Sequence, residues 1–350
     1  GITGETPEPP GGLIDRDLNT GEPTGLLFEM LGYIRERVLP PLTQEELMQG
    51  IALANQHYLS YGITSLQEAT VGNNLSRWQT LRRFKNANKL RSRLSMMLGP
   101  EALSQFREMG LATGSGDSQL RLGGAKMILN ETTGRLHPPQ SELNQWALDA
   151  HRAGFQLAFH AIEPSTVEAA ITALEYVASR FSQTGRRHRI EHCSECPPQL
   201  LERLSKLQAV IVTQPPFLYY SGERYLTNLP ENRLQWLYRI KSFLDSGLIV
   251  AGSSDCPVVH DNPLVGIYAA VTRQTESGEL LLPQERVSAS QALAMYTINA
   301  AYASFEEKII SAKKSFQKGI CLSAYSKDKY FSYEINNELN QLDEIGTEWI

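Results

Sequence analysis

Apolar residues recur along this chain in two alternating patterns. Short runs rich in apolar and β-branched residues predict buried strands, and longer segments with apolar positions three and four residues apart predict amphipathic helices. The predicted strands cover residues 63–67, 92–98, 122–129, 155–160, 187–191, 208–213 and 248–252. The predicted helices cover residues 43–62, 73–88, 101–110, 140–153, 164–180, 197–206, 231–246, 264–275 and 288–302.

Several helix ends carry their own sequence signals. Thr43 and Glu46 have the spacing of a capping box, in which each side chain bonds the other residue's backbone N–H group. Ser288 and Gln291 repeat that spacing. Gly62 stands where a helix needs a residue that tolerates a left-handed backbone. These signals fix the ends of two helices more firmly than periodicity does.

Strands that alternate strictly with helices imply a parallel sheet. More than six such units in one chain favour a closed barrel over an open sheet. We therefore predict an α/β fold, a (β/α)8 TIM barrel. Seven strands are visible in the sequence, so the eighth either lies within residues 13–40 or is outside this chain.

Composition divides the chain into three parts. Residues 1–42 begin with a proline- and glycine-rich stretch and are predicted to be an extended lead-in and insertion. Residues 43–307 carry the barrel units. Residues 308–350 are polar and poorly periodic, so we interpret them as a C-terminal appendage.

Overall composition limits the possible partners. The chain has 350 residues with 33 Lys and Arg against 38 Asp and Glu, a formal charge of −5, which gives no electrostatic reason to expect nucleic acid. No apolar run reaches the ~18–20 residues that cross a bilayer. Four cysteines do not make a disulfide framework, which favours a reducing compartment, the cytoplasm. We expect a small-molecule substrate, no nucleic-acid or membrane partner, and a homo-oligomer as an open option.

Three metal-capable side chains follow or end predicted strands. His160 ends one strand, His192 follows another and Asp255 follows the last. In a barrel of this type functional side chains lie at the C-terminal ends of strands. Lys126 places a cation inside an apolar strand, where an unpaired charge is costly. Two imidazoles, a carboxylate and a lysine carbamate made from CO2 would together suit one or two divalent ions, zinc above all.

Each of these residues also has a simpler interpretation. The two histidines could be hydrogen-bonded structural side chains, and Asp255 could cap the following helix. Lys126 could extend its amine to solvent, or serve as a Schiff-base lysine in a lyase. Cys193 and Cys196 form a C-x-x-C pair that invites a zinc or redox interpretation, although no second cysteine pair exists.

Several segments together resemble the amidohydrolase superfamily, specifically the family 3 branch that includes N-substituted formamide deformylase-like proteins. These segments span most of residues 5–307 and read TPEPPGGLIDRDLNTGEPTGLLFE, GITSLQEAT, GFQLAFHAI, RHRIEHC, SDCPV, NPLVGIYAAVTR and ALAMYTINAAYASFEE. The resemblance implies that Lys126 is a carboxylated lysine bridging two metals and that His160 and His192 hold one of them. It implies that Asp255 binds the other and accepts the proton of the attacking water.

The chain departs from the family pattern in several places. No two of its seven histidines are separated by one residue, so the His-x-His pair that the family has on strand 1 is absent. By the resemblance, strand 1 and most of the accessory β-sandwich are then missing, and 308–350 would hold only a partial return to that sandwich. Within the site, Glu163 and Asn130 stand near positions where the family commonly has aspartate.

The sequence thus predicts a metal-dependent hydrolase acting on a non-peptide carbon–nitrogen bond, an amide, formamide or cyclic amide, through a metal-activated water. Gln214, Tyr219 and Arg233, in or after the long loop that follows residues 208–213, are candidates for substrate binding, with ordinary loop and helix surface as the alternative. Two other functions stay open. The chain could be an incomplete barrel without catalysis, or a Schiff-base lyase using Lys126.

Overall fold

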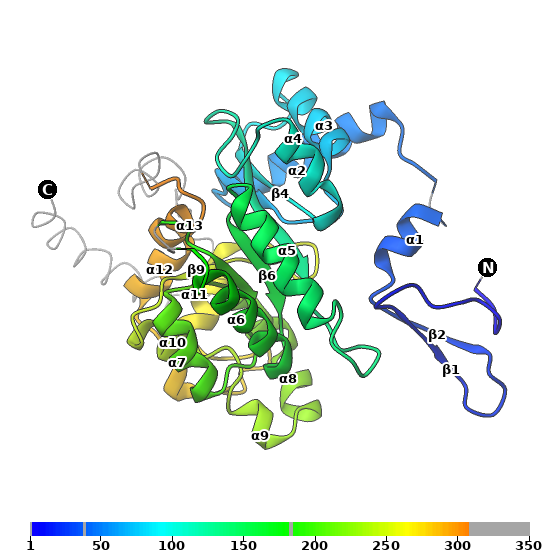
Figure 1. Ribbon diagram of the computed structural model, residues 1–350. Helices are drawn as coiled ribbons and strands as arrows, with labels where there is room; N and C mark the ends of the chain where they lie inside the picture. Colours follow the sequence, from blue (N-terminus) through cyan, green and yellow to red (C-terminus); the bar gives the residue numbers. More distant parts are fainter. Residues whose placement is uncertain (1, 38–39, 182–184, 308–350) are drawn as a thin grey trace, which may run out of the picture. The chain divides into compact units, whose positions relative to one another are not determined.

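The computed structural model describes residues 2–37, 40–181 and 185–307. The contacts between residues divide the chain into two compact units, whose helices and strands are labelled in Figure 1. The first contains Gly1–Ala54 and Gln67–Arg186, and the second contains Asn55–Leu66 and Arg187–Ile350. Two boundaries between the units fall inside secondary-structure elements, one within helix α2 (Gln44–Ser60) and one within strand β3 (Ser65–Glu68). The predicted C-terminal appendage, residues 308–350, lies outside the described residues.

The first unit is built on parallel strands that alternate with helices. Strand β5 pairs in parallel with both β4 and β6, so the strand order repeats the chain order. Helices α5 and α6 pack against each other, and the Trp146 ring of α5 meets the buried Phe159 ring of β6 edge-on. The remaining elements of this unit are β1 (Leu13–Arg16), β2 (Pro23–Phe28), α1 (Leu31–Arg37), α3 (Leu75–Asn86), β4 (Arg93–Leu98), η1 (Pro100–Ala102), α4 (Leu103–Glu108), β5 (Leu120–Ile128), α5 (Gln140–Arg152), β6 (Leu157–Ala161) and α6 (Pro164–Ala178).

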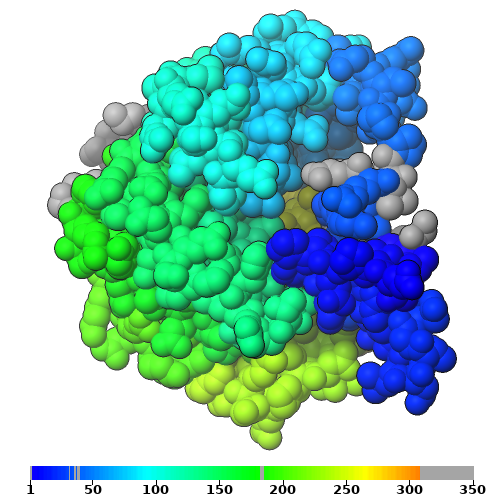
Figure 2. All heavy atoms as spheres, turned by 45° about the vertical axis from the view of Figure 1, so that its right-hand side comes forward, coloured from blue at the N-terminus to red at the C-terminus, as the bar shows by residue number. Residues whose placement is uncertain are grey.

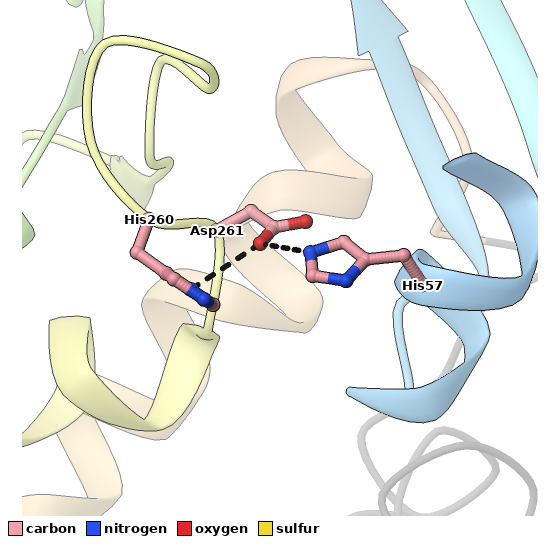
Figure 3. Close-up of side chains that lie close together, drawn as sticks. All are labelled: His57, His260 and Asp261. Atoms are coloured by element: carbon pink, nitrogen blue, oxygen red, sulfur yellow. Dashed lines mark hydrogen bonds and ion pairs between the residues drawn. The ribbon is translucent and has the colours of Figure 1, made fainter. Parts of the chain in front are cut away.

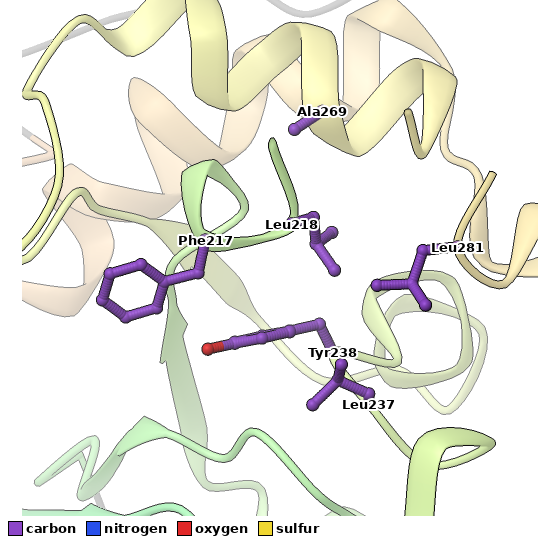
Figure 4. Packing of buried hydrophobic residues seen from close by; sticks show 6 residues of the cluster. All are labelled: Phe217, Leu218, Leu237, Tyr238, Ala269 and Leu281. Atoms are coloured by element: carbon purple, nitrogen blue, oxygen red, sulfur yellow. The ribbon is translucent and has the colours of Figure 1, made fainter. Parts of the chain in front are cut away.

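The second unit repeats this plan. Strand β8 pairs in parallel with β7 and β9, and helices α12 and α13 pack on β9. A cluster of buried apolar side chains in this unit contains Phe217, Leu218 and Tyr238 (Figure 4). The elements are β7 (Arg189–His192), α7 (Pro198–Leu207), β8 (Val210–Thr213), α8 (Pro216–Asn228), α9 (Glu231–Leu234), α10 (Ile240–Asp245), β9 (Val250–Gly252), α11 (Pro263–Thr272), η2 (Pro283–Glu285), α12 (Ala289–Tyr296) and α13 (Ile298–Ala303).

All seven predicted strands are confirmed within a few residues, as β3 to β9. The two capping boxes are also present. The backbone N–H of Thr43 donates to a Glu46 carboxylate oxygen at 2.7 Å, and the Glu46 N–H donates to the Thr43 hydroxyl at 3.2 Å. Ser288 and Gln291 make the same reciprocal pair. The α/β interpretation of the sequence is therefore confirmed, while closure into an eight-stranded barrel stays a prediction.

The lead-in contains regular structure that the sequence pattern does not predict. Strands β1 and β2 form an antiparallel pair of their own, with Leu13 opposite Phe28. The Asp17 carboxylate accepts the backbone N–H groups of Asn19 and Thr20 at 2.9 Å each, which holds the tight connection. Within the described part of residues 13–40 these are the strands present, and the parallel strand sought there is not among them.

Two predicted helices are interrupted and one predicted loop is helical. Residues 231–246 divide into α9 and α10, and residues 288–302 divide at Thr297. The chain after β8, predicted as a long loop, forms α8, which begins at Pro216. Proline is well suited to a first helical turn because it has no N–H to leave unpaired there. Among the described residues no helix is long and apolar enough to cross a membrane.

The break between α9 and α10 is explained by a buried arginine. Arg273 is completely buried, and its guanidinium donates to the carbonyl oxygens of Leu281 at 2.9 Å, Tyr238 at 2.8 Å and Leu237 at 3.3 Å. Burial lowers the pKa of Arg273 to about 10, and the nearby charge of Glu285 opposes that shift. The carbonyl groups of Leu237 and Tyr238 accept hydrogen bonds from Arg273 and not from the backbone N–H groups of a continuing helix. The arginine of the NPLVGIYAAVTR segment therefore has a structural role.

We predict that Arg273→Met lowers the free energy of unfolding by about 3 kcal/mol, because three buried carbonyls lose their donor. Arg224→Met, which removes an exposed arginine of α8, is the matched control and should change it by less than about 0.5 kcal/mol. Urea unfolding followed by circular dichroism measures both. Equal midpoints for the two variants would contradict this role for Arg273.

Candidate metal centre

Lys126 and His160 lie on neighbouring strands of the first unit. In the register of β5 and β6, Lys126 is opposite Ala158 and Ile128 is opposite His160. Since side chains two residues apart on a strand share a face, both functional side chains project from the same face of the sheet. Lys126 is buried, with 8% of its surface exposed, whereas His160 is half-buried.

The Lys126 ammonium makes no hydrogen bond or ion pair within the described parts of the chain. A buried cation without a partner is costly, and proteins ordinarily neutralise, modify or pair it. A modified or metal-associated Lys126 stays a prediction. The Nζ atom is not among the fully buried, unpartnered atoms of the described residues, so an amine that reaches solvent stays an alternative.

His192, in the second unit, is held by a buried glutamine. Its Nδ1 lies 2.7 Å from Oε1 of Gln214, and the Gln214 amide nitrogen donates to the Val212 carbonyl at 3.3 Å and the Ser253 hydroxyl at 2.9 Å. With the amide nitrogen donating to two oxygens, Oε1 is the acceptor and Nδ1 carries the proton. The lone pair is then on Nε2, the tautomer in which a second hydrogen bond orients a metal-binding imidazole.

Asp255 follows β9 and is exposed, with a left-handed backbone at φ 57°. The helix that follows is capped by Asn262, whose side-chain oxygen accepts the Leu264 N–H at 3.0 Å, so the capping interpretation of Asp255 is wrong. Beside it, the pKa of the Cys256 thiol is raised by burial and by the neighbouring carboxylates. A ligand role for Asp255 stays a prediction.

The three residues considered for substrate binding occupy different environments. Gln214 is buried, and its side-chain amide is engaged in the hydrogen bonds with His192, Val212 and Ser253 described above. Tyr219 lies on α8, half-buried and edge-on to two other tyrosines. Arg233 makes two hydrogen bonds to the buried Glu195 carboxylate, at 2.6 and 2.5 Å. The geometry gives Gln214 and Arg233 structural partners, and a substrate role for any of the three stays a prediction.

Cys193 and Cys196 are both buried and unoxidised. A hydrogen bond with Cys196, together with burial, raises the pKa of Cys193 well above its ordinary value. Metal binding and thiol exchange both require the thiolate. The environment therefore disfavours the zinc and redox interpretations of the C-x-x-C pair.

One group of metal-capable side chains escapes the sequence analysis. His57, His260 and Asp261 place ligand atoms close together in the second unit (Figure 3). The adjacency of His260 and Asp261 is the only feature of the local sequence that could have pointed to this group. His57 is 204 residues away from Asp261 in the chain, so no spacing rule would have joined them.

The model of the amidohydrolase family matches residues 1–311. This chain belongs to the amidohydrolase family. N-substituted formamide deformylase of Arthrobacter pascens is 28% identical over 344 residues, covering 90% of this chain and 63% of that protein.

Two solved structures, both described as metal-dependent hydrolases, share the fold. The one from Pyrococcus furiosus has a TM-score of 0.67 at 27% identity, and the one from Pyrococcus horikoshii 0.68 at 25%. They cover 79% and 80% of this chain, and 59% of each of those chains. The chain thus spans less than two thirds of the length of each of these relatives.

The four predicted ligands fall into two pairs. Lys126 and His160 share a sheet face in the first unit. In the second unit His192 is the last residue of β7 and Asp255 follows β9. Within each unit the parallel strands explain why such residues collect at one end. Convergence of all four on one metal stays a prediction.

We predict that Gln214→Leu removes the acceptor that fixes the His192 tautomer and lowers the free energy of unfolding by about 1–3 kcal/mol. Histidine ¹⁵N NMR reports the tautomer, and urea unfolding reports the stability. Gln214→Glu, which keeps an acceptor oxygen, should retain the Nδ1–H form. The exposed Gln235→Leu is the control for stability. An unchanged His192 spectrum in Gln214→Leu would contradict the assignment.

Proposed function

We propose that this protein is a metal-dependent hydrolase that cleaves a non-peptide carbon–nitrogen bond, with Lys126, His160, His192 and Asp255 as the metal ligands. The observation that carries the proposal is the buried Lys126 on the same sheet face as His160, in a chain of the amidohydrolase family. A bound divalent ion would lower the pKa of a water molecule and polarise the substrate carbonyl.

Lys126 would enter the site as a carbamate. Its neutral amine adds to CO2, a nitrogen–carbon bond forms and a proton is released, so that a buried cation becomes an anion with two donor oxygens. A carbamate without a counter-charge would be as costly as the ammonium, so modification and metal binding stabilise each other. The apolar surroundings of β5 therefore favour the modified lysine only when a divalent cation is present.

His192 would bind through Nε2, because its Nδ1 proton is held by Gln214. This fixes the ring before metal arrives and removes the need to select a tautomer. His160, near the end of β6, would supply the second imidazole. Neutral imidazoles with oxygen donors are the ligand set that suits zinc and similar divalent ions.

Asp255 would hold and move the proton. An exposed carboxylate at a strand end can accept a proton from water on one of its oxygens and then donate that proton to the leaving nitrogen. Protonation of nitrogen is the step that makes an amine a competent leaving group. The name of the 28% identical deformylase supports a formamide or related amide as the substrate class.

We predict that Lys126→Ala abolishes both carbamate formation and one equivalent of bound metal. The chain is purified with ¹³C-bicarbonate and Zn²⁺, the carbamate is followed by ¹³C NMR and zinc per chain by plasma mass spectrometry. Lys206→Ala, which removes a lysine with 71% of its side chain exposed, is the matched control. A wild-type chain with no carbamate signal and the same zinc content as Lys126→Ala would refute the ligand role.

We predict that Asp255→Asn lowers kcat by at least about a hundredfold while KM changes little, because the amide cannot carry the proton. The assay measures amine release from a panel of N-substituted formamides and cyclic amides by the metal-loaded chain. Asp245→Asn, at an exposed position of α10, is the control. An Asp255→Asn variant with wild-type kcat would exclude this role.

A further inference from the structure

The second unit contains a group of three metal-capable side chains that shares no residue with the proposed centre. His57 projects from the end of α2 toward Asp261, and His260 lies next to Asp261 just before α11 (Figure 3). The Nε2 atom of His57 is 2.8 Å from Oδ1 of Asp261, and Nδ1 of His260 is 3.4 Å from the same oxygen. One ligand atom from each residue lies within 4.8 Å of the other two.

The carboxylate of Asp261 is buried and only half satisfied. Its side chain is 4% exposed, and its Oδ2 atom has no hydrogen-bond partner among the described residues. Both imidazoles approach Oδ1, while Oδ2 points away from them (Figure 3). A cation held among the three side chains would bind Oδ1 and compensate the buried negative charge of Asp261.

The two imidazoles are accessible and oriented. Their side chains are 47% and 45% exposed, and the Tyr61 ring meets both edge-on, at 5.0 Å from His57 and 5.4 Å from His260. The centroids of the two imidazoles are 5.8 Å apart. A cation can therefore reach the imidazoles from solvent, and Tyr61 limits the rotation of both rings. Nδ1 of His260 also accepts the backbone N–H of Asn262 at 3.3 Å, which a cation bound at that nitrogen would displace.

We propose that His57, His260 and Asp261 form a second divalent-metal site, selective for Zn²⁺ and chemically similar ions. Two imidazole nitrogens and a carboxylate oxygen are three of the four donors of a tetrahedral zinc site, and solvent supplies the fourth. Donors about 2 Å from a tetrahedral ion lie roughly 3.3 Å apart, so the 2.8 Å pair opens slightly when metal replaces the shared proton. The ion would cross-link residues 55–66 to the start of α11.

The test uses the full chain carrying Lys126→Ala, which leaves this group intact while removing a ligand of the proposed centre. The apo protein is titrated with Co²⁺, the visible d–d absorption of tetrahedral cobalt is recorded, and competition with Zn²⁺ gives the zinc Kd. We expect one equivalent to bind. Asp261→Asn and His260→Gln should each raise the Kd at least about tenfold and weaken the tetrahedral spectrum.

Asp245→Asn is the matched control and should leave the Kd unchanged. Circular dichroism identifies any variant that fails to fold. If Asp261→Asn does not fold, His260→Gln decides the test, since that imidazole is half exposed. Unchanged binding in folded His260→Gln, or no Co²⁺ bound by the Lys126→Ala chain, overturns the site. The absence of a carbamate signal in the wild-type chain would contradict the proposed catalytic centre and leave this second site untouched. The two proposals can therefore fail independently.

Discussion

Parallel hydrogen bonding between successive strands is the constraint on which the rest of this molecule depends. In β4 to β6, and again in β7 to β9, each strand runs in the same direction as its neighbour, so each needs a helix to bring the chain back. Strands in that arrangement are buried on both faces, which explains their nearly continuous apolar runs. It also sends every strand's carboxyl end to one edge of its sheet, where polar side chains can gather without breaking the core.

Buried polar groups are the second constraint, and several of them are satisfied by contacts between segments that are distant in the chain. Arg273 donates to three carbonyls, and Arg233 neutralises the buried Glu195. Among the buried side-chain atoms of the described residues that lack a hydrogen-bond partner, one belongs to a charged side chain, the Oδ2 atom of Asp261. Asp261 lies in a loop beside His260, and Lys126 lies on the strand next to the one that carries His160. Each proposal starts from one of these arrangements.

The two proposed sites differ in construction. The first is built from strand ends, and its chemistry depends on a modified lysine and on a glutamine that fixes one imidazole. The second is built from a helix end and a loop, and its imidazoles are half exposed around a buried carboxylate. In the first site Lys126 and His192 are buried while Asp255 is exposed, so the metal ligands would be held firmly and the proton-carrying group would reach solvent. The accessible imidazoles of the second site suit structural cross-linking or metal exchange.

The sequence by itself determined the seven parallel strands, both capping boxes and the family, and it singled out the four candidate ligands, because strand burial and helix capping are local properties that leave periodic and short-range signals. Only the tertiary structure decided the rest. The β1–β2 hairpin, helix α8 and the break before α10 follow from contacts that no period reveals, as the break follows from Arg273. Gln214, a candidate for substrate binding, positions His192, and the meeting of His57 with Asp261 joins residues 204 positions apart. Contacts of that range are fixed by packing, which the order of residues encodes only through the whole fold.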